Sequence, residues 1–406
     1  MSAFQDSQES FIDVYPTVTL VPTSHVGSSS PTEYISVDDT QSTYVLQLAN
    51  LTSAYAASLS HPRHDLPLYD KHTLKHVHTF SGHANTVSQI RTVEVQGRKA
   101  LVSCGKDGAI KFWDERIGSE CTLQINAPNR RLLLSFDVAH DGYSIAAGTE
   151  FREDETPILF WDARQPALPS HSHTATHSDD VTAVHFHPTD STLLLSASAD
   201  GLICTSRATE KDEDEAGLHV GNWGCSIARV GWKEGGIWAT SDMETFSLWN
   251  TELDLVRGYG DVRQPEIPSL WNTDYLIDAS WSSSSTSPWN TSELTFWMGN
   301  NSGNVGIATV KEDSTWQLHH ILSGGHEEVV RCVLWDAENS VVVTGGEDAR
   351  IATWSGPAPE TADAAMDEAM EGEEDESVVG KKRGFDSTTV GKRPEKWGKK
   401  RRHAKE

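Results

Sequence analysis

A residue pair that resembles tryptophan-aspartate recurs along this chain at a nearly constant spacing, and this repeat restricts the fold more than any other feature. Successive pairs lie 44, 48, 45 and 43 residues apart, and a double step of 105 residues spans one degenerate copy. A period in the mid-forties is typical of one four-stranded sheet, or blade, repeated around an axis. The seven positions are Tyr69-Asp70, Trp113-Asp114, Trp161-Asp162, Ser206-Arg207, Trp249-Asn250, Ala308-Thr309 and Trp354-Ser355.

The repeat also determines the expected domain organisation. A chain of 406 residues would ordinarily divide into two or three domains. A ring of blades grows by addition instead, because each blade buries its faces against its neighbours. We therefore expect one ring domain over residues 33–356, a disordered N-terminal segment over residues 1–32 and a disordered tail over residues 357–406.

Composition excludes several functional classes. No apolar stretch approaches the ~20 residues of a membrane span, and the first residues carry no secretory signal. The five cysteines are scattered without CxxC spacing, which favours free thiols in a reducing compartment. The chain contains no GxxxxGK, GxSxG or HExxH motif. We therefore expect no enzymatic activity, no cofactor, no metal and no membrane contact.

The second repeat is the most regular copy. It runs from Gly82-His83 through Asp107-Gly108, a tight-turn dipeptide, to Trp113-Asp114. This block resembles the WD-repeat family, which implies an all-β fold, a seven-bladed WD-repeat β-propeller, used as a protein-binding platform. In that family a His, a Ser or Thr, an Asp and a Trp form a buried hydrogen-bond network. The corresponding residues here are His83, Ser103, Asp107 and Trp113.

Two further copies match this pattern. The last repeat supplies the full set, which is His326, Thr344, Asp348 and Trp354. The fourth repeat supplies His177, Ser196 and Asp200, but Ser206 replaces the tryptophan. An Asp-His-Ser set can suggest a hydrolase. The resemblance implies instead that the set is buried and structural. Several other stretches, among them residues 176–188 and 344–349, resemble one subfamily of these proteins, for which the resemblance implies no enzymatic activity.

The ring must also close. The chain after Trp354 reads Ser-Gly-Pro-Ala-Pro, which cannot supply the outer strand of the last blade. The sequence therefore predicts that Glu33–Val37 pairs with the last blade and removes the exposed edge.

The charge distribution suggests a class of partner. Residues 357–406 hold 12 of the 59 acidic and 11 of the 33 basic residues, so residues 1–356 carry a net charge of about −25. Such a body should repel nucleic acid and attract basic proteins, for example a ribosomal protein or a histone. We expect a monomeric scaffold whose contacts lie on the rim that carries the loops between blades. The candidates flank the network residues and are Asn85, Lys106, Asp179, Asp180, Glu327, Glu328 and Glu347.

Two acidic insertions interrupt the repeat. Glu150–Glu155 falls in a hairpin turn and should project from the same rim, whereas Glu210–Glu215 should hang from the opposite rim. Each is either a solvated loop or a docking patch for a basic partner. The serine-rich residues 281–293 are interpreted as a surface loop, which is either merely tolerated or phosphorylated.

The C-terminal tail changes composition abruptly. Residues 360–376 hold nine acids and are followed by basic clusters. These clusters predict nuclear import, with RNA contact or a plain solvated tail as the alternatives. We expect the protein in the nucleus and also in the cytoplasm. The basic residues are Lys381, Lys382, Arg383, Lys392, Arg393, Lys399, Lys400, Arg401 and Arg402.

A second functional hypothesis rests on the pattern Trp-Asp-x-Arg, which places Arg116 and Arg164 after two of the pairs. In the WD-repeat family this pattern resembles that of substrate receptors for cullin-4-type ubiquitin ligases, where the arginine contacts an adaptor. An arginine can bind a carboxylate through two parallel hydrogen bonds.

Overall fold

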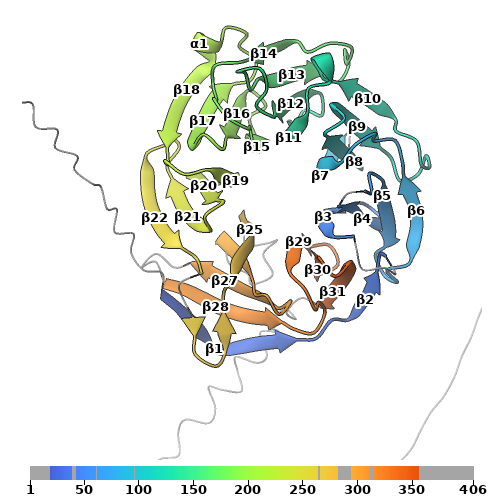
Figure 1. The fold of residues 1–406 in the computed structure, drawn as a ribbon, viewed down its shortest axis with the longest axis vertical. Helices are drawn as coiled ribbons and strands as arrows, with labels where there is room; N and C mark the ends of the chain where they lie inside the picture. The colour runs from blue at the N-terminus through green and yellow to red at the C-terminus, as the bar shows by residue number, and fades with distance from the viewer. Residues whose placement is uncertain are drawn as a thin grey trace, which may run out of the picture. The chain divides into compact units, whose positions relative to one another are not determined.

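The computed structural model describes residues 19–38, 43–60, 62–95, 97–263, 266–281, 294–310 and 315–355. Within these residues the chain forms seven sheets of at least four strands, arranged as blades around one axis (Figure 1). The predicted seven-bladed β-propeller is confirmed. In each blade one edge strand of the sheet lies nearest the axis and the opposite edge strand lies at the periphery (Figure 1).

The strands of the first four blades follow the chain in order. Blade 1 consists of β3 (Val45–Asn50), β4 (Ala54–Leu59), β5 (Leu66–Asp70) and β6 (His76–Phe80). Blade 2 consists of β7 (Val87–Val95), β8 (Arg98–Gly105), β9 (Ala109–Trp113) and β10 (Leu123–Asn126), and a 3-10 turn, η1 (Pro128–Arg130), follows it. Blade 3 consists of β11 (Leu133–Val138), β12 (Ser144–Thr149), β13 (Ile158–Asp162) and β14 (His171–His173). Blade 4 consists of β15 (Ala183–Phe186), β16 (Leu193–Ala197), β17 (Leu202–Arg207) and β18 (Gly217–Asn222), with α1 (Glu213–Ala216) before β18.

The last three blades are less uniform. Blade 5 consists of β19 (Ile227–Lys233), β20 (Gly236–Ser241), β21 (Thr245–Trp249) and β22 (Leu255–Asp261). A small hairpin follows it, formed by β23 (Glu266–Ile267) and β24 (Trp271–Asn272). Blade 6 consists of β25 (Tyr275–Trp281), β26 (Leu294–Gly299), β27 (Val305–Val310), β28 (Thr315–Leu322) and a fifth strand, β1 (Thr19–Ser29). Blade 7 consists of β29 (Val330–Asp336), β30 (Val341–Gly346), β31 (Arg350–Ser355) and β2 (Glu33–Ser36).

The turn between the second and third strands shows why the repeat uses Asp-Gly. Gly108 has a φ of 74°, and a Cβ on it would lie 2.9 Å from backbone atoms of Arg130 and Arg131 in the next inter-blade loop. A side chain there would meet both a left-handed backbone and that loop. The last blade makes the equivalent turn with Ala349, whose φ is 58°.

The two ends of the ring are joined as predicted. Strand β2 pairs antiparallel with β31, so that Glu33 lies opposite Thr353 and Ser36 lies opposite Arg350. The backbone N–H of Val37 adds a bond of 2.8 Å to the carbonyl of Ala349. The outer strand of blade 7 therefore comes from the other end of the ring.

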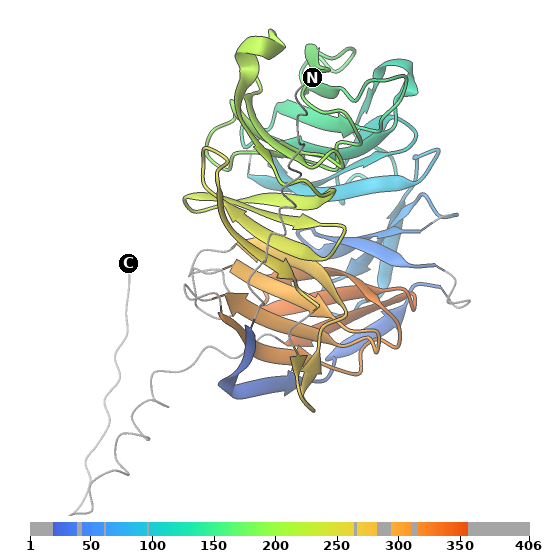
Figure 2. The ribbon, with the colours of Figure 1, turned by 60° about the vertical axis from the view of Figure 1, so that its left-hand side comes forward.

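The expected disorder over residues 1–32 is wrong for part of that range. Strand β1 runs parallel to β28 along the outer side of blade 6 (Figures 1 and 2). Leu20 is buried there in an apolar cluster with Trp316, Tyr259 and Trp271. The sequence around this strand is polar and contains proline, and the apolar partners of Leu20 lie more than 200 residues away, so no local pattern predicts the strand. Residues 1–18, residues 282–293 and residues 356–406 lie outside the described part of the chain.

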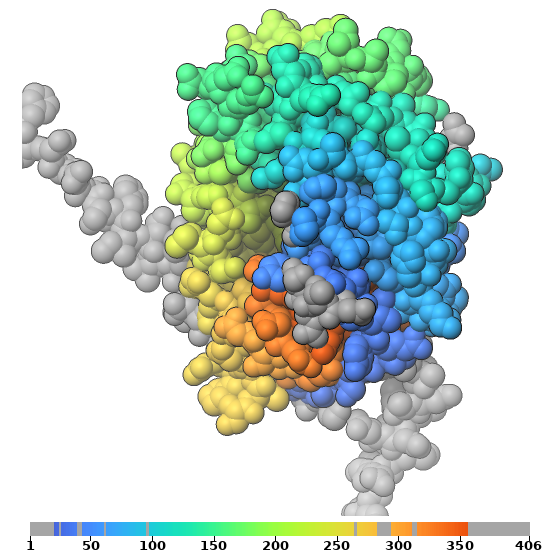
Figure 3. Space-filling view, turned by 45° about the vertical axis from the view of Figure 1, so that its right-hand side comes forward, coloured from blue at the N-terminus to red at the C-terminus, as the bar shows by residue number. Residues whose placement is uncertain are grey.

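Side chains of the innermost strands link each blade to the next. Each of the seven junctions has a hydrogen bond between a side chain of one blade and the backbone of its neighbour, as in the bond of 2.8 Å from Gln47 Nε2 to the Ser88 carbonyl. The other six side chains are Gln89, Asp137, Thr182, Arg229, Tyr275 and Cys332. Together these strands line a central channel of about 420 Å³. Figure 3 shows the hollow at the channel mouth.

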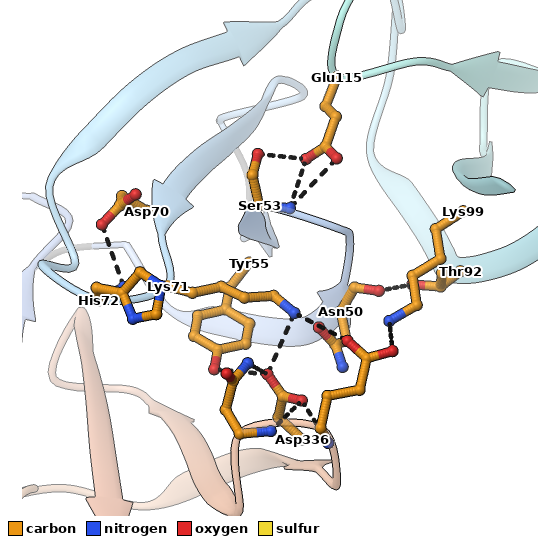
Figure 4. Close-up of polar contacts among 12 residues, drawn as sticks. Asn50, Ser53, Tyr55, Asp70, Lys71, His72, Thr92, Lys99, Glu115 and Asp336 are labelled. Atoms are coloured by element: carbon orange, nitrogen blue, oxygen red, sulfur yellow. Dashed lines mark hydrogen bonds and ion pairs between the residues drawn. The ribbon is translucent and has the colours of Figure 1, made fainter. Parts of the chain in front are cut away.

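The junction between blades 7 and 1 contains a buried ion pair (Figure 4). Lys71 Nζ lies 3.2 Å from Asp336 Oδ2, and the two side chains are 4% and 0% exposed. Tyr55 donates to the same carboxylate at 3.0 Å, and Asn339 Nδ2 donates to it at 2.8 Å. Burial alone would raise the pKa of Asp336, but the hydrogen bond from Asn339 and the charge of Lys71 hold it below its usual value.

Candidate interaction surfaces on the two rims

The direction of the strands divides the loops into two rims. The upper rim carries the turns between the second and third strands of each blade, together with the loops that connect one blade to the next. The lower rim carries the remaining turns, including those that follow the third strands. Asp107 and His83 therefore belong to the upper rim, and Asp114 belongs to the lower rim.

The structure brings the four network residues of blade 2 together. The Trp113 indole donates to Ser103 Oγ at 2.8 Å, and that oxygen lies 2.7 Å from His83 Nε2. His83 Nδ1 lies 3.0 Å from Asp107 Oδ2. Because a carboxylate only accepts, Nδ1 carries the hydrogen and Nε2 accepts from the serine hydroxyl. Every polar group in this buried chain then has a partner.

Blade 7 repeats this geometry. His326 Nδ1 lies 3.0 Å from Asp348 Oδ1, and His326 Nε2 lies 2.8 Å from Thr344 Oγ1. The Trp354 indole donates to the same hydroxyl at 2.9 Å. Asp348 also accepts from the backbone N–H of Glu327 at 2.9 Å, which fixes the start of the upper-rim loop.

The network of blade 4 lacks its tryptophan. His177 Nε2 lies 2.9 Å from Ser196 Oγ, and Nδ1 lies 3.3 Å from Asp200 Oδ2. Burial would raise the pKa of Asp200, but hydrogen bonds from His177 and from the Ser178 backbone lower it to about 2. In blade 3, which has no Gly-His pair, the Trp161 indole nitrogen is buried without a partner among the described residues.

These networks do not expose a nucleophile. Ser103 is 0% exposed, and its hydroxyl is already engaged by both the indole and the imidazole. A substrate therefore has no path to the hydroxyl without displacing the blade core. The arrangement holds the upper-rim loops rigid, and the side chains that flank each network are presented outward.

Three of the predicted upper-rim residues meet around one cavity. Glu327, Glu328 and Glu347 line a space of about 190 Å³ together with Asp348 and Tyr44. Two of the carboxylates have cationic neighbours, because Glu327 lies 2.7 Å from Arg350 and Glu347 pairs with Arg331. Tyr44 comes from the loop between β2 and β3, and it is 40% exposed. No local sequence motif marks Tyr44, so its place in this cavity could not be predicted.

The other upper-rim candidates lie elsewhere on the ring. Asn85 and Lys106 are exposed beside the network of blade 2. Asp179 is exposed and Asp180 half-buried in the loop between blades 3 and 4, where Asp180 accepts from the Phe151 backbone N–H at 2.7 Å.

The acidic turn Glu150–Glu155 lies on the upper rim, as its position between β12 and β13 requires. Arg131 holds this turn by donating to the Arg152 carbonyl at 2.6 Å. Phe151 is 45% exposed within it, which places an aromatic ring among carboxylates. The charge of this turn is evident from the sequence, but no local pattern marks its aromatic residue as exposed.

The two motif arginines occupy equivalent places on the lower rim. Arg116 Nε and Nη2 donate to the two carboxylate oxygens of Asp114 at 2.9 and 2.6 Å. Arg164 binds Asp162 in the same way, and its guanidinium also lies over the Tyr143 ring at 4.8 Å. The two-bond face expected to meet a partner carboxylate is therefore occupied by the neighbouring aspartate. Both guanidiniums remain accessible, with side chains 59% and 66% exposed.

The insertion Glu210–Glu215 follows the third strand of blade 4, as expected for a lower-rim turn, but it does not hang free from that rim. Its Glu213 carboxylate accepts hydrogen bonds from the Thr174 and Ala175 backbones at 2.7 and 2.8 Å. The Thr176 hydroxyl adds a third bond at 2.6 Å. The insertion thus packs beside the loop between blades 3 and 4, where Figure 1 places α1 near β14. Backbone N–H groups at that loop need an acceptor, and a nearby carboxylate supplies it.

Two of the predicted features fall outside the residues that the structure describes. The basic residues from Lys381 to Arg402 and most of the serine-rich stretch lie outside the described residues. Among the residues that are described, no group of three or more His, Cys, Asp or Glu could hold a metal ion. The same residues include no helix long and apolar enough to cross a membrane.

Comparison with known proteins agrees with this architecture. The family described as WD domain, G-beta repeat matches residues 74–114, 169–204 and 316–355. The chain is 30% identical to WD repeat-containing protein GTS1 of Arabidopsis thaliana over 334 residues, which cover 77% of this chain and 81% of the relative. It is 34% identical to an uncharacterized WD repeat-containing protein of Saccharomyces cerevisiae over 187 residues, which cover 44% of this chain and 46% of that one.

The subfamily resemblance of residues 176–188 and 344–349 is to WD repeat-containing protein 89, and this prediction is confirmed. The homolog of that protein from Dictyostelium discoideum is 27% identical over 324 residues, which cover 78% of this chain and 84% of the relative. The closed ring of seven blades, the His–Ser/Thr–Asp–Trp networks and these similarities agree, and the chain belongs to the WD-repeat family.

Proposed function

We propose that this propeller is a nuclear scaffold whose upper rim binds a basic segment of a partner protein. WD-repeat propellers are generally interaction scaffolds without catalytic activity, so we take protein binding as the general function of this ring. The observation that favours a basic partner is the cavity lined by Glu327, Glu328, Glu347, Asp348 and Tyr44. A lysine or arginine side chain would meet the Glu328 carboxylate, the neighbouring carboxylates and the Tyr44 ring there.

A second acidic stretch also favours the upper rim as the surface that binds a basic partner. The turn Glu150–Glu155 exposes Phe151 and the carboxylates of Glu153, Asp154 and Glu155, and its backbone is bonded to Asp180. The net charge of about −25 over residues 1–356 would add long-range attraction for a cationic segment. A ribosomal protein or a histone, held during assembly, has the required chemistry.

The nuclear part of this proposal rests on the basic clusters between Lys381 and Arg402. A reporter fused to residues 378–406 tests it in cells. Accumulation of the reporter in the nucleus supports import, and a wholly cytoplasmic signal contradicts it. Replacing Lys399–Arg402 by alanine in the same fusion is the matched control, and it should reduce nuclear accumulation.

The binding part can be tested with a purified lysine- and arginine-rich peptide. Glu328→Lys reverses a charge at the cavity, and Glu120→Lys makes the same change on an exposed residue of the lower rim. We expect Glu328→Lys to weaken binding at least tenfold and Glu120→Lys to weaken it less than twofold. Raising the salt from 50 to 300 mM should weaken wild-type binding strongly. Equal effects of the two substitutions would exclude the upper-rim cavity as the site.

The lower rim favours an alternative function, which is that of a substrate receptor for a ubiquitin ligase. Arg116 and Arg164 present accessible guanidiniums at equivalent positions of adjacent blades, and the same two turns contain Ile117 and Leu168, which are 66% and 73% exposed. This surface suits the adaptor of a cullin-4-type ubiquitin ligase. Affinity purification with mass spectrometry separates the two functions. Loss of ligase subunits only from the Arg116→Ala/Arg164→Ala variant supports the receptor, whereas basic nuclear proteins released by salt support the scaffold.

A further inference from the structure

We propose that the outer edge of blade 6 is a docking site for an extended segment of a partner protein, which replaces β1 as the fifth strand of the sheet. Strand addition to a sheet edge supplies affinity through backbone hydrogen bonds and specificity through side-chain pockets. Two observations support this proposal: the pairing of β1 with β28 is interrupted, and an apolar cluster lies beneath β1.

Strand β1 is not needed to close the ring. Blade 6 already has its fourth strand in β28, and β2 completes blade 7. Only residues 30–32 separate β1 from β2. The segment can therefore leave the edge of β28 while β2 remains paired with β31.

The pairing of β1 with β28 is incomplete. The parallel register runs from Thr19 to Pro22, breaks, and resumes from Gly27 to Ser29. Pro22 has no N–H to donate to the ladder. Of the β1 side chains that the structure describes, only Leu20 is buried, at 7% exposure. A continuous strand would make more backbone bonds along the same edge.

The surface under β1 is built for apolar side chains. Leu20 packs in a cluster with Trp316, Trp271 and Tyr259, and Val26 packs against the same cluster. Ile267 of the β23–β24 hairpin joins this cluster, so the hairpin forms a second wall beside the edge. The Trp316 indole nitrogen is buried there without a partner in the described part of the chain. An occupant with a suitably placed acceptor would satisfy it.

These features identify the chemistry of the partner. It is an extended segment with aliphatic residues at the positions of Leu20 and Val26 and with no proline between them. A second copy of this chain is a poorer candidate, because it brings the same Pro22 and the same broken register.

A labelled peptide tests the proposal on the full chain. The peptide carries residues 19–29 with Pro22→Val, and its affinity is measured for the wild type, for Leu20→Asp and for Val256→Asp. Val256 is 64% exposed on β22, the outer strand of blade 5, and is the matched control. We expect the Leu20→Asp protein to bind the peptide at least tenfold more tightly than the other two, because its own β1 is weakened. A second peptide that also carries Leu20→Asp should not bind.

Equal affinity for the wild type and the Leu20→Asp variant, or no binding to either, overturns the proposal. Dimerisation of the Leu20→Asp variant, measured by light scattering, would also overturn it, since a second copy would then be the occupant. Hydrogen exchange on the wild type provides a measurement that does not depend on any variant folding. Amides of the β1–β28 ladder should exchange at least tenfold faster than those of the β2–β31 ladder. Equal protection of the two ladders would contradict an exchangeable strand.

Discussion

The Trp113 indole donates a hydrogen bond of 2.8 Å to Ser103, and in blade 4 the equivalent Ser196 has no tryptophan above it, because Ser206 takes that place. The two serine hydroxyls therefore have different numbers of hydrogen-bond partners in otherwise similar networks. Ser103 joins an indole and an imidazole, whereas Ser196 is bonded to His177.

This difference predicts unequal losses of stability. Ser103→Ala leaves two buried groups without a partner, and each such group destabilises by about 1–3 kcal/mol. We expect a loss of about 3 kcal/mol for Ser103→Ala and about half of that for Ser196→Ala. Urea unfolding of the two variants measures both values. Equal losses would show that the indole bond contributes nothing.

The lowered pKa of Asp200 predicts a loss of stability in acid. Its pKa is about 2 in the folded protein, compared with about 3.9 in an unfolded chain. A group with a depressed folded pKa stabilises the fold fully above its unfolded pKa, and this contribution disappears as the pH falls from about 4 towards 2. The contribution at neutral pH is about 2 kcal/mol. Asp107 and Asp348 have pKa values shifted in the same direction.

Asp200→Asn isolates this effect. At pH 7 we expect the variant to be less stable than the wild type by about 2 kcal/mol, and the difference should shrink as the pH approaches 2. Denaturant unfolding at pH 7, 4, 3 and 2.5 measures the trend. A difference that stays constant over this range would assign the loss to packing rather than to the charge.

The features that could be predicted from the sequence are those that one repeat contains by itself. His83, Ser103, Asp107 and Trp113 lie within 31 consecutive residues, so their spacing marks them. The closing strand at Glu33–Val37 was also predictable, because a ring with a Pro-rich end requires a donor for its last edge.

The features that the sequence did not reveal depend on partners in distant blades. Tyr55 and Asp336 are 281 residues apart, and no local pattern relates them. Leu20 sits in a polar stretch, and its burial depends on a surface formed by blades 5 and 6. Glu213 belongs to a run of acids that suggests solvent exposure, yet three hydrogen bonds from the loop between blades 3 and 4 hold it. Charge pattern alone does not distinguish a solvated carboxylate from one that caps backbone N–H groups.

The closing strand predicts a graded response to truncation. Deleting residues 1–37 removes β2 and exposes the edge of β31, so we expect the melting temperature to fall by about 10 °C or more. Deleting residues 1–29 removes only β1 and should lower it by about half as much, since Leu20 is the main buried anchor lost. Differential scanning calorimetry of both truncations measures the shifts. Equal shifts would place the stabilisation in β1 rather than in β2.

The buried ion pair between Lys71 and Asp336 predicts a large loss of stability when Lys71 is replaced. Removing one partner of a buried pair leaves the other charge uncompensated and typically destabilises by about 3–5 kcal/mol. Lys71→Met leaves Asp336 with only its neutral donors Tyr55 and Asn339, together with nearby backbone N–H groups. We expect a loss of about 3 kcal/mol. Adding Asp336→Asn removes the stranded charge, so the double variant should recover part of that loss even though two polar contacts are gone. Urea unfolding of both single variants and the double variant gives the coupling between the residues. Additive losses would mean that the two charges do not stabilise each other, and that the junction between blades 7 and 1 depends on Tyr55 and Asn339 instead.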